Sequence, residues 1–377
     1  VNLVLPMGIS FYTFQAMGYI IDVYRGTVTA EKNFFRFALF VSFFPQLVQG
    51  PISRFGDLQK SLFAEHSFDS RNVSFGLQRI LWGFFKKLVI ADRILVAVNA
   101  IIRNPDEYSA AYAFVGMLFY ALELYADFTG GIDITIGVAQ VLGVEVTENF
   151  RRPYFSKNIK EYWNRWHITM GTWFTDYIFY PISVCKPMLK LSKFSRNHLG
   201  EAIGKRVTVY LSSFVVWFAT GIWHGASWNF IAWGLYYGVL LLIERFVLHA
   251  ALEKLPKAVR HVLTFLVVIV GWVIFYYTDF AAVGQHLLAM LGVGKTAVGG
   301  IAALPLTDAA FRRVWKKYTV FPLLAFLFAL PLPQKLKSLG EKTAASALRW
   351  AGTAAFLALD VVFLIGQSYN PFIYFRF

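Results

Sequence analysis

The chain has 377 residues, of which 57% are hydrophobic, 18% aromatic and only 15% charged. Soluble domains carry about 25% charged residues, so this composition excludes an ordinary soluble domain and predicts an integral membrane protein. The formal net charge of +14 comes from basic residues in the loops between apolar runs. It indicates loops at an anionic membrane surface or attraction of an anionic substrate. Because the basic residues are scattered among these loops, nucleic-acid binding is disfavoured.

Apolar runs predict an all-α, polytopic membrane protein. The early runs, at residues 34–52, 77–101 and 111–144, are interrupted by proline, amide or charged side chains. We therefore expect these helices to be tilted, re-entrant or buried, with Glu123 and Asp133 paired to Lys or Arg on neighbouring helices. Five clearer runs follow, at residues 207–222, 228–243, 262–278, 318–332 and 348–366. Neither a repeat nor a linker divides residues 1–377, which predicts one membrane domain.

Between these groups of runs lies a polar and strongly aromatic segment, NFRRPYFSKNIKEYWNRWHITMGTW, at residues 149–173. From residue 159 the spacing predicts a helix on which Trp163 and Asn164 share a face with His167. The segment is typical of an interfacial anchor or of a helix that dips into the protein, and composition leaves both interpretations open.

His224 occurs in FATGIWHGASWNF, within a stretch that carries no formal charge from residue 207 to residue 243. Gly221 and Gly225 flank it and allow a backbone or a ligand to approach closely. Two interpretations remain: a histidine that hydrogen-bonds across helices, or a general base, since neutral imidazole accepts a proton from a hydroxyl group.

Other chemistries have weaker support in the sequence. His167 and His224 lack a third ligand at a metal-binding spacing, and Cys185 is the only cysteine, so we expect neither a metal site nor an internal disulfide. No GxSxG motif supports a Ser-His-Asp triad. His249 and His261 flank basic loops and are expected to be solvated.

Several motifs resemble the membrane-bound O-acyltransferase (MBOAT) family, in its bacterial alginate and peptidoglycan O-acetyltransferase branch. The matching stretches are LPMGISFYTFQAMGYIIDVYRG, FFPQLVQGPISRF, ENFRRPYFSKNIKEYWNRWHITMGTWFTDYIFYPI, GIWHGASWNFIAWGLYYG and SYNPFIYFRF. The resemblance implies a ring of helices with re-entrant segments around a central tunnel. The family's N-terminal helices have no counterpart before LPMGISFYTF, so we expect an N-terminal portion to precede Val1.

The resemblance also implies the roles of particular residues. His224 matches the family's catalytic histidine and His167 the second histidine of the bacterial branch. In the tail, Phe372, Tyr374 and Phe377 fit the branch's FxYxxF motif, whose tyrosine carries the acyl group.

Acetyl-CoA is the implied acyl donor, held on the cytoplasmic side of the bacterial inner membrane. A set of residues in and before WNRWH is expected to bind it: Arg151, Arg152, Lys157, Lys160, Trp163 and Asn164. The implied partners are membrane lipids, a cell-surface polysaccharide and an extracytoplasmic SGNH-hydrolase-like protein that delivers the acyl group.

Three alternatives stay open at this point. One is D-alanyl transfer to teichoic acid from a carrier protein, because that enzyme shares WNRWH. Another is a transporter of acyl groups or glycans, with Asp127 and Asp133 as ion-coupling sites. The third is a scaffold for a polysaccharide secretion complex.

Overall fold

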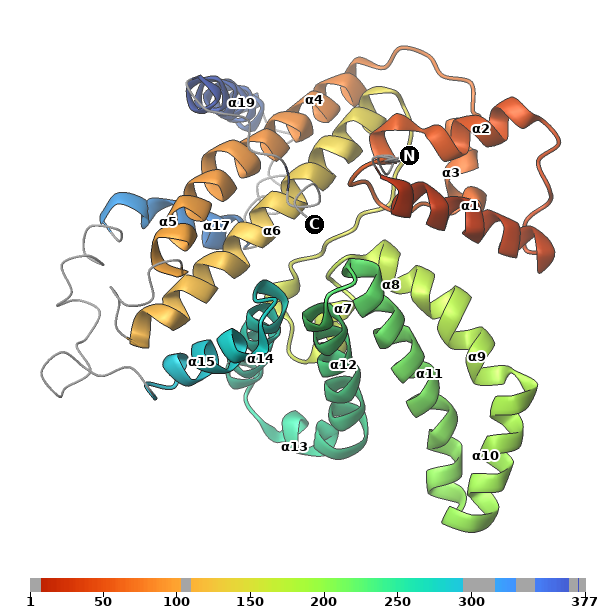
Figure 1. Cartoon of the computed structure of the whole chain (residues 1–377). Coiled ribbons are helices and arrows are strands. Elements are labelled where there is room, and N and C mark those ends of the chain that lie inside the picture. Colours follow the sequence, from red (N-terminus) through yellow and green to blue (C-terminus); the bar gives the residue numbers. More distant parts are fainter. Residues whose placement is uncertain (1–7, 103–109, 294–315, 330–342, 366–371, 373–377) are drawn as a thin grey trace, which may run out of the picture. The chain divides into compact units, whose positions relative to one another are not determined.

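The computed structural model describes residues 8–102, 110–293, 316–329, 343–365 and 372 (Figure 1). Every regular element in these ranges is helical, as the apolar pattern predicts. The chain divides into two compact units: residues 1–13, 31–147 and 284–377 form the first, and residues 14–30 and 148–283 form the second. Two of the four boundaries along the chain fall within helices, one in α1 (Ile9–Tyr24) and one in α15 (Phe280–Met290).

The described elements of the first unit include α2 (Phe34–Ser42), α3 (Phe55–Leu62), α4 (Ser70–Phe84), the π-helical η2 (Phe85–Ala91), α5 (Asp92–Ile102), α6 (Ala110–Val141), α17 (Val320–Ala329) and α19 (Thr343–Leu364).

Glycine residues allow two long helices of this unit to pack closely. In Figure 1, α4 and α6 run side by side. A Cβ on Gly76 would lie 2.7 Å from the carbonyl oxygen of Gly137, and one on Gly83 would lie 2.6 Å from that of Gly130. The two backbones therefore touch at two levels, an approach that side chains would prevent.

Buried ion pairs join η2 to α5 and to α6. Lys87, only 3% exposed, lies 3.0 Å from Asp92 and 2.5 Å from Asp127. Lys86 lies 2.5 Å from Asp133. The predicted pairing of Asp133 is therefore confirmed, and it explains how charged residues are accommodated in otherwise apolar helices.

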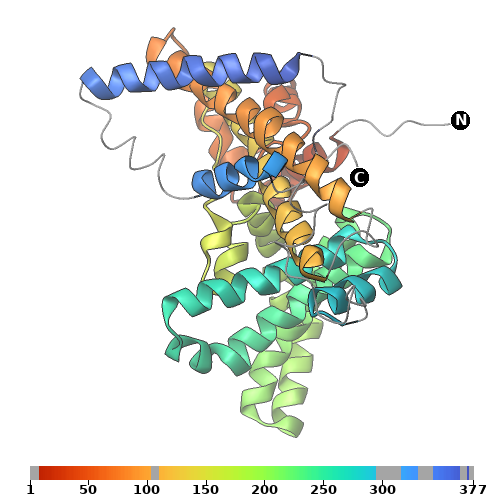
Figure 2. The same ribbon diagram turned by 90° about the vertical axis from the view of Figure 1, so that its left-hand side faces the viewer.

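An aromatic contact places α19 against the same stretch. The ring of Phe356 lies 5.4 Å from Trp82 and 4.7 Å from Phe85, centroid to centroid. Figure 2 shows α19 running along the upper edge beside α4.

The second unit is built from helices, some of them long and strongly apolar. Its elements include η4 (Pro153–Phe155), α7 (Ile159–Trp163), α8 (Ile168–Phe174), η5 (Thr175–Phe179), α9 (Tyr180–Val184), α10 (Lys186–Leu199), α11 (Glu201–His224), α12 (Trp228–Ile243), η6 (Glu244–Leu248), α13 (His249–Lys254) and α14 (Lys257–Tyr276). Three stretches within the described residues are long and apolar enough to cross a membrane: Glu201–His224, Trp228–Lys254 and Lys257–Tyr276. They coincide with the runs at residues 207–222, 228–243 and 262–278.

Glycines also set the distance between α11 and α12. A Cβ on Gly221 would lie 2.6 Å from the carbonyl oxygen of Phe230, and one on Gly234 would lie 2.2 Å from that of Trp217. This close packing fixes the C-terminal end of α11, and with it His224, against the start of α12.

Candidate active site

His224 is the last residue of α11, at the turn into α12. The next residue, Gly225, has a φ of +149°, a conformation that favours glycine, and its amide donates to the carbonyl of Ile222 at 3.1 Å. The helix therefore ends at the histidine, and the imidazole lies at a helix terminus beside the following helix.

Aromatic rings surround the His224 imidazole. Its ring centroid lies 4.8 Å from that of Trp233 and 5.1 Å from that of Phe275, both nearly perpendicular, and 4.6 Å from that of Trp223. His224 Nε2 is buried and has no hydrogen-bond partner among the described residues. Buried polar atoms are nearly always paired, so an unpaired imidazole nitrogen points to a partner supplied by a ligand or a reacting group.

The surrounding aromatic cluster carries further unpaired polar tips. In the described part of the chain these are Tyr162 Oη, Trp163 Nε1, Asn229 Oδ1, Trp233 Nε1, Tyr237 Oη and Trp272 Nε1. Trp163, a predicted site residue, belongs to this cluster, with its ring 5.6 Å from Trp233 and 4.8 Å from Tyr237. The cluster thus combines apolar walls with polar groups, the usual composition of a ligand site.

The helix predicted through WNRWH is wrong. α7 ends at Trp163, and α8 begins at Ile168 with His167 as its N-cap residue. His167 has a φ of +46°, a left-handed conformation that costs roughly 1–2 kcal/mol for a residue with a Cβ. Trp163 and His167 therefore share no helical face, and Asn164 lies exposed in the intervening turn.

A distant asparagine explains how the turn at His167 persists. Asn149 is fully buried, and its side chain lies beside the imidazole, with Nδ2 3.3 Å and Oδ1 3.4 Å from His167 Nδ1. Its Oδ1 also accepts from the amide of Thr169 at 3.0 Å, at the start of α8. Sequence reasoning missed Asn149, because nothing in the local pattern links it to residues 167–169.

Trp223 connects the two histidines. Its ring centroid lies 5.9 Å from that of His167 and 4.6 Å from that of His224. Burial, together with the nearby His224 ring, lowers the pKa of His167 to about 3. His167, 1% exposed, is therefore neutral at physiological pH.

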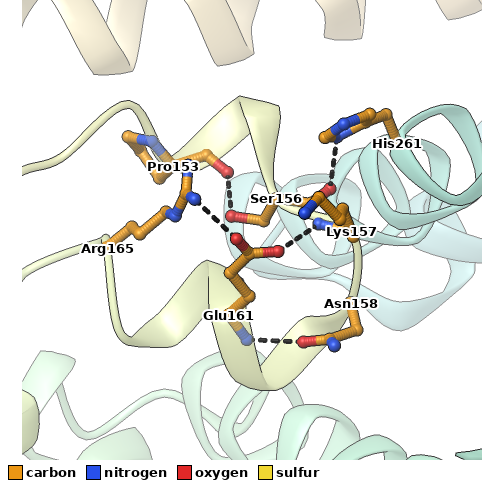
Figure 3. Close-up of polar contacts among 7 residues, drawn as sticks. All are labelled: Pro153, Ser156, Lys157, Asn158, Glu161, Arg165 and His261. Atoms are coloured by element: carbon orange, nitrogen blue, oxygen red, sulfur yellow. Dashed lines mark hydrogen bonds and ion pairs between the residues drawn. The ribbon is translucent and has the colours of Figure 1, made fainter. Parts of the chain in front are cut away.

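A carboxylate organises the segment before His167, as Figure 3 shows. Glu161 binds the guanidinium of Arg165 at 2.5 Å through Oε1 and accepts from the amide of Lys157 at 2.7 Å through Oε2. Asn158 caps α7, since its Oδ1 accepts from the Glu161 amide at 2.7 Å. These contacts make the short helix and its flanking turns one hydrogen-bonded unit.

Two longer-range contacts attach this segment to the spanning helices. Glu244, at the end of α12, accepts from the amides of Ile159 (2.6 Å) and Lys160 (3.1 Å), the first two residues of α7. His261 on α14 lies partly buried with Nδ1 3.1 Å from the carbonyl oxygen of Ser156 (Figure 3). The prediction that His261 is solvated is therefore only partly correct, because the side chain is half-buried and one ring nitrogen faces this carbonyl.

The predicted donor-binding cations lie in the same segment, outside the aromatic cluster. Arg151 and Lys160 are exposed, and Arg152 and Lys157 are partly buried. They remain accessible to an anionic ligand. Tyr374 lies outside the described residues.

Comparison with known proteins identifies the family. Residues 29–284 match the MBOAT, membrane-bound O-acyltransferase family. A protein named probable alginate O-acetylase from Azotobacter vinelandii is 33% identical over 401 residues, covering 100% of this chain and 76% of that protein. The peptidoglycan O-acetyltransferase of Helicobacter pylori is 27% identical over 418 residues, covering 100% and 75%. The teichoic acid D-alanyltransferase of Bacillus subtilis is 30% identical over 253 residues, covering 65% and 60%.

The family match covers most of the second unit, including both histidines and the three helices of spanning length. The chain therefore belongs to the membrane-bound O-acyltransferase family and is a multi-pass membrane O-acyltransferase.

Proposed function

We propose that this protein transfers acetyl groups from cytoplasmic acetyl-CoA, across the bacterial inner membrane, for O-acetylation of an extracytoplasmic polysaccharide. The observation that carries the proposal is the buried, unpaired Nε2 of His224 in an aromatic cluster that also contacts His167. Support for acetyl as the group comes from relatives named O-acetylase and O-acetyltransferase that align over the whole chain, whereas the D-alanyltransferase relative aligns over 65% of it.

In the proposed reaction, His224 is the general base. Its Nε2 accepts the proton of the attacking hydroxyl group while the hydroxyl oxygen bonds to the thioester carbonyl carbon. The carbon–sulfur bond then breaks, and the proton passes from His224 to the departing thiolate. The aromatic rings around His224 limit the entry of water, which would otherwise compete as the acceptor.

The acceptor in this proposal is the hydroxyl group of Tyr374. The tethered tail gives it a high local concentration, and the aryl ester that forms is reactive enough to pass the acetyl group on. An SGNH-hydrolase-like partner outside the membrane receives the acetyl group on a serine and transfers it to the polysaccharide. Phe372 of the same motif is partly buried, with its ring 5.0 Å from Lys87 Nζ, so part of the tail contacts the protein.

Replacing the proposed base tests the reaction. His224→Ala should lower acetyl transfer from radiolabelled acetyl-CoA by about 10²–10⁴-fold, the usual contribution of a general base. His249→Ala is the matched control, because that side chain is 67% exposed. Transfer by His224→Ala within tenfold of wild type would reject the base, and activity only with a D-alanyl carrier protein would reject acetyl-CoA as donor.

Charge reversal tests the donor site. Arg151→Glu with Arg152→Glu should raise the KM for acetyl-CoA at low ionic strength, with a smaller effect at high salt. Lys190→Glu with Lys193→Glu changes the net charge equally on α10 and should leave that KM unchanged. Equal effects of the two pairs would mean that total charge, and no local site, attracts the donor.

Removal of the Tyr374 hydroxyl group tests whether the C-terminal tail carries the acetyl group. Tyr374→Phe keeps the ring and should eliminate both the acetylated C-terminal peptide seen by mass spectrometry and acetylation of the polysaccharide. Full polysaccharide acetylation by this variant would exclude the tyrosine relay.

A further inference from the structure

Asn149 contacts three consecutive residues around the second histidine. Its backbone carbonyl accepts from the amide of Ile168 at 3.0 Å. Its side-chain Oδ1 accepts from both the amide and the hydroxyl of Thr169, each at 3.0 Å. Its Nδ2 lies 3.3 Å from Nδ1 of His167. Asn149, which is completely buried, therefore contacts two backbone amides, one hydroxyl group and one imidazole nitrogen.

These contacts replace the cap that α8 would otherwise lack. His167 occupies the N-cap position, yet its own side chain makes no capping hydrogen bond. Asn149 supplies the acceptor that an N-cap side chain normally provides to the second or third amide of a helix. The imidazole of His167 is thereby released from capping and is turned toward the indole of Trp223.

The same contacts favour one tautomer of His167. A backbone amide only donates, so the atom of Asn149 that faces the Thr169 amide must be the oxygen. Two donors from Thr169 occupy that oxygen's two lone pairs. Nδ1 of His167 lies 3.3 Å from the amide nitrogen of Asn149 and 3.4 Å from this oxygen. Because the oxygen already accepts two hydrogen bonds, the amide nitrogen donates to Nδ1, and Nδ1 acts as an acceptor. A neutral imidazole that accepts at Nδ1 carries its hydrogen on Nε2.

We propose that Asn149 is a positioning residue that locks His167 in the Nε2–H tautomer, so that His167 donates a hydrogen bond to the thioester carbonyl oxygen. This inference rests on the proposed function, in which His224 is the base. The two histidines then have opposite roles: His224 accepts the hydroxyl proton, and the Nε2–H of His167 stabilises negative charge on the carbonyl oxygen as the new carbon–oxygen bond forms. The charge collapses as the carbon–sulfur bond breaks, and His167 keeps its proton throughout.

The substitution Asn149→Asp separates this role from capping. Aspartate caps a helix as well as asparagine does, so the contacts to Thr169 are kept. A carboxylate offers only acceptors, so Nδ1 of His167 must now donate, and the neutral ring loses the hydrogen on Nε2. We expect kcat for transfer from acetyl-CoA to fall about 10²–10³-fold, the effect of removing one oxyanion donor, with little change in the KM for acetyl-CoA.

The pH dependence distinguishes the tautomer from a general loss of structure. In the aspartate variant the carboxylate favours protonated His167, which again carries a hydrogen on Nε2. The rate of Asn149→Asp relative to wild type should therefore rise as the pH falls; taking this ratio cancels the titration of the nearby His224. Asn158→Asp, at the N-cap of α7, is the matched control and should stay near the wild-type rate at each pH. A ratio that does not change with pH would contradict the inference.

Spectroscopy on the wild-type protein gives a test independent of activity. Solid-state NMR of the full chain with ¹⁵N-labelled histidine, minus the spectrum of His167→Gln, isolates the His167 ring nitrogens. We expect the neutral ring with its hydrogen on Nε2; a hydrogen on Nδ1 would overturn the inference even if Asn149→Asp fails to fold. An active His224→Ala variant would instead refute the proposed function, so the two failures are distinguishable.

Discussion

Replacement of Glu244 by alanine should loosen the segment that carries His167. Glu244 is the acceptor for the first two amides of α7, at 2.6 Å to Ile159 and 3.1 Å to Lys160. These amides have no partner within their own helix, because the first turn of any helix leaves its N–H groups free. Glu244→Ala removes both contacts at once and leaves the Asn158 cap in place.

The size of the effect follows from how accessible each amide is. A hydrogen bond to a charged group contributes about 1.5–3 kcal/mol. Ile159 is buried, so its amide loses the full contribution, whereas Lys160 is exposed and water can replace most of its bond. We therefore expect a loss of about 2–3 kcal/mol. For a cooperative unit of 150–250 residues this corresponds to a fall in Tm of roughly 4–12 °C.

Thermal unfolding of the purified protein in one detergent, at one scan rate, measures this shift. The control is Glu201→Ala, which removes an exposed 3.0 Å ion pair with Lys205 and should cost less than about 0.5 kcal/mol. Glu244→Gln, which keeps one acceptor oxygen, should fall between wild type and Glu244→Ala. Equal Tm values for Glu244→Ala and Glu201→Ala would refute the reasoning.

Three further predictions concern packing, buried charge and pH. Gly221→Ala should lower the Tm, because its Cβ would lie 2.6 Å from a carbonyl oxygen of α12, whereas Gly284→Ala, with no atom within 4 Å, should leave it unchanged or raise it. Lys87→Met should cost about 3–5 kcal/mol, because it removes the cation that lies between two buried carboxylates. Lys60 is 74% exposed at its side chain, so Lys60→Met should be nearly neutral in the same Tm assay. The pKa of His167 is about 3 in the folded protein and about 6.5 in the unfolded chain. At a pH between these two pKa values, unfolding is therefore accompanied by uptake of a proton at His167. Stability should therefore decline as the pH falls from about 6.5 toward 3, and His167→Gln should reduce that decline in Tm measured across pH.

Local pattern was sufficient for the membrane class and for most of the helices. The three spanning stretches of the second unit follow directly from apolar runs, because a segment must satisfy its own backbone hydrogen bonds in a bilayer whatever its neighbours are. The pairing of Asp133 was predictable for a similar reason: a charge in an apolar helix requires a partner, although the pattern does not name Lys86 or Arg79.

The immediate surroundings of His224 were also encoded locally. The glycine after it ends α11, and the following residues start α12, so the histidine lies at a helix end through its own neighbours in sequence. What sequence could not supply was the set of rings around it. Phe275 comes from α14, more than 50 residues away along the chain.

For His167 the local rule failed. Helical spacing placed Trp163 and His167 on one face, yet the chain breaks between them, because distant groups stabilise a conformation that local preference opposes. Asn149 satisfies the amides at the start of α8, and Glu244 satisfies those at the start of α7. Neither contact follows a periodic pattern.

By itself the sequence determined that this protein lies in a membrane, where its apolar helices run and which histidines are candidates for chemistry, since these properties depend on composition and short-range spacing. Only the tertiary structure decided that His167 leaves its helix to approach Trp223, which also contacts His224, and that Asn149 lies against the imidazole of His167. The physical reason is that a left-handed turn and an uncapped helix end are unfavourable alone and become stable only when hydrogen-bond partners from elsewhere in the chain are brought to them.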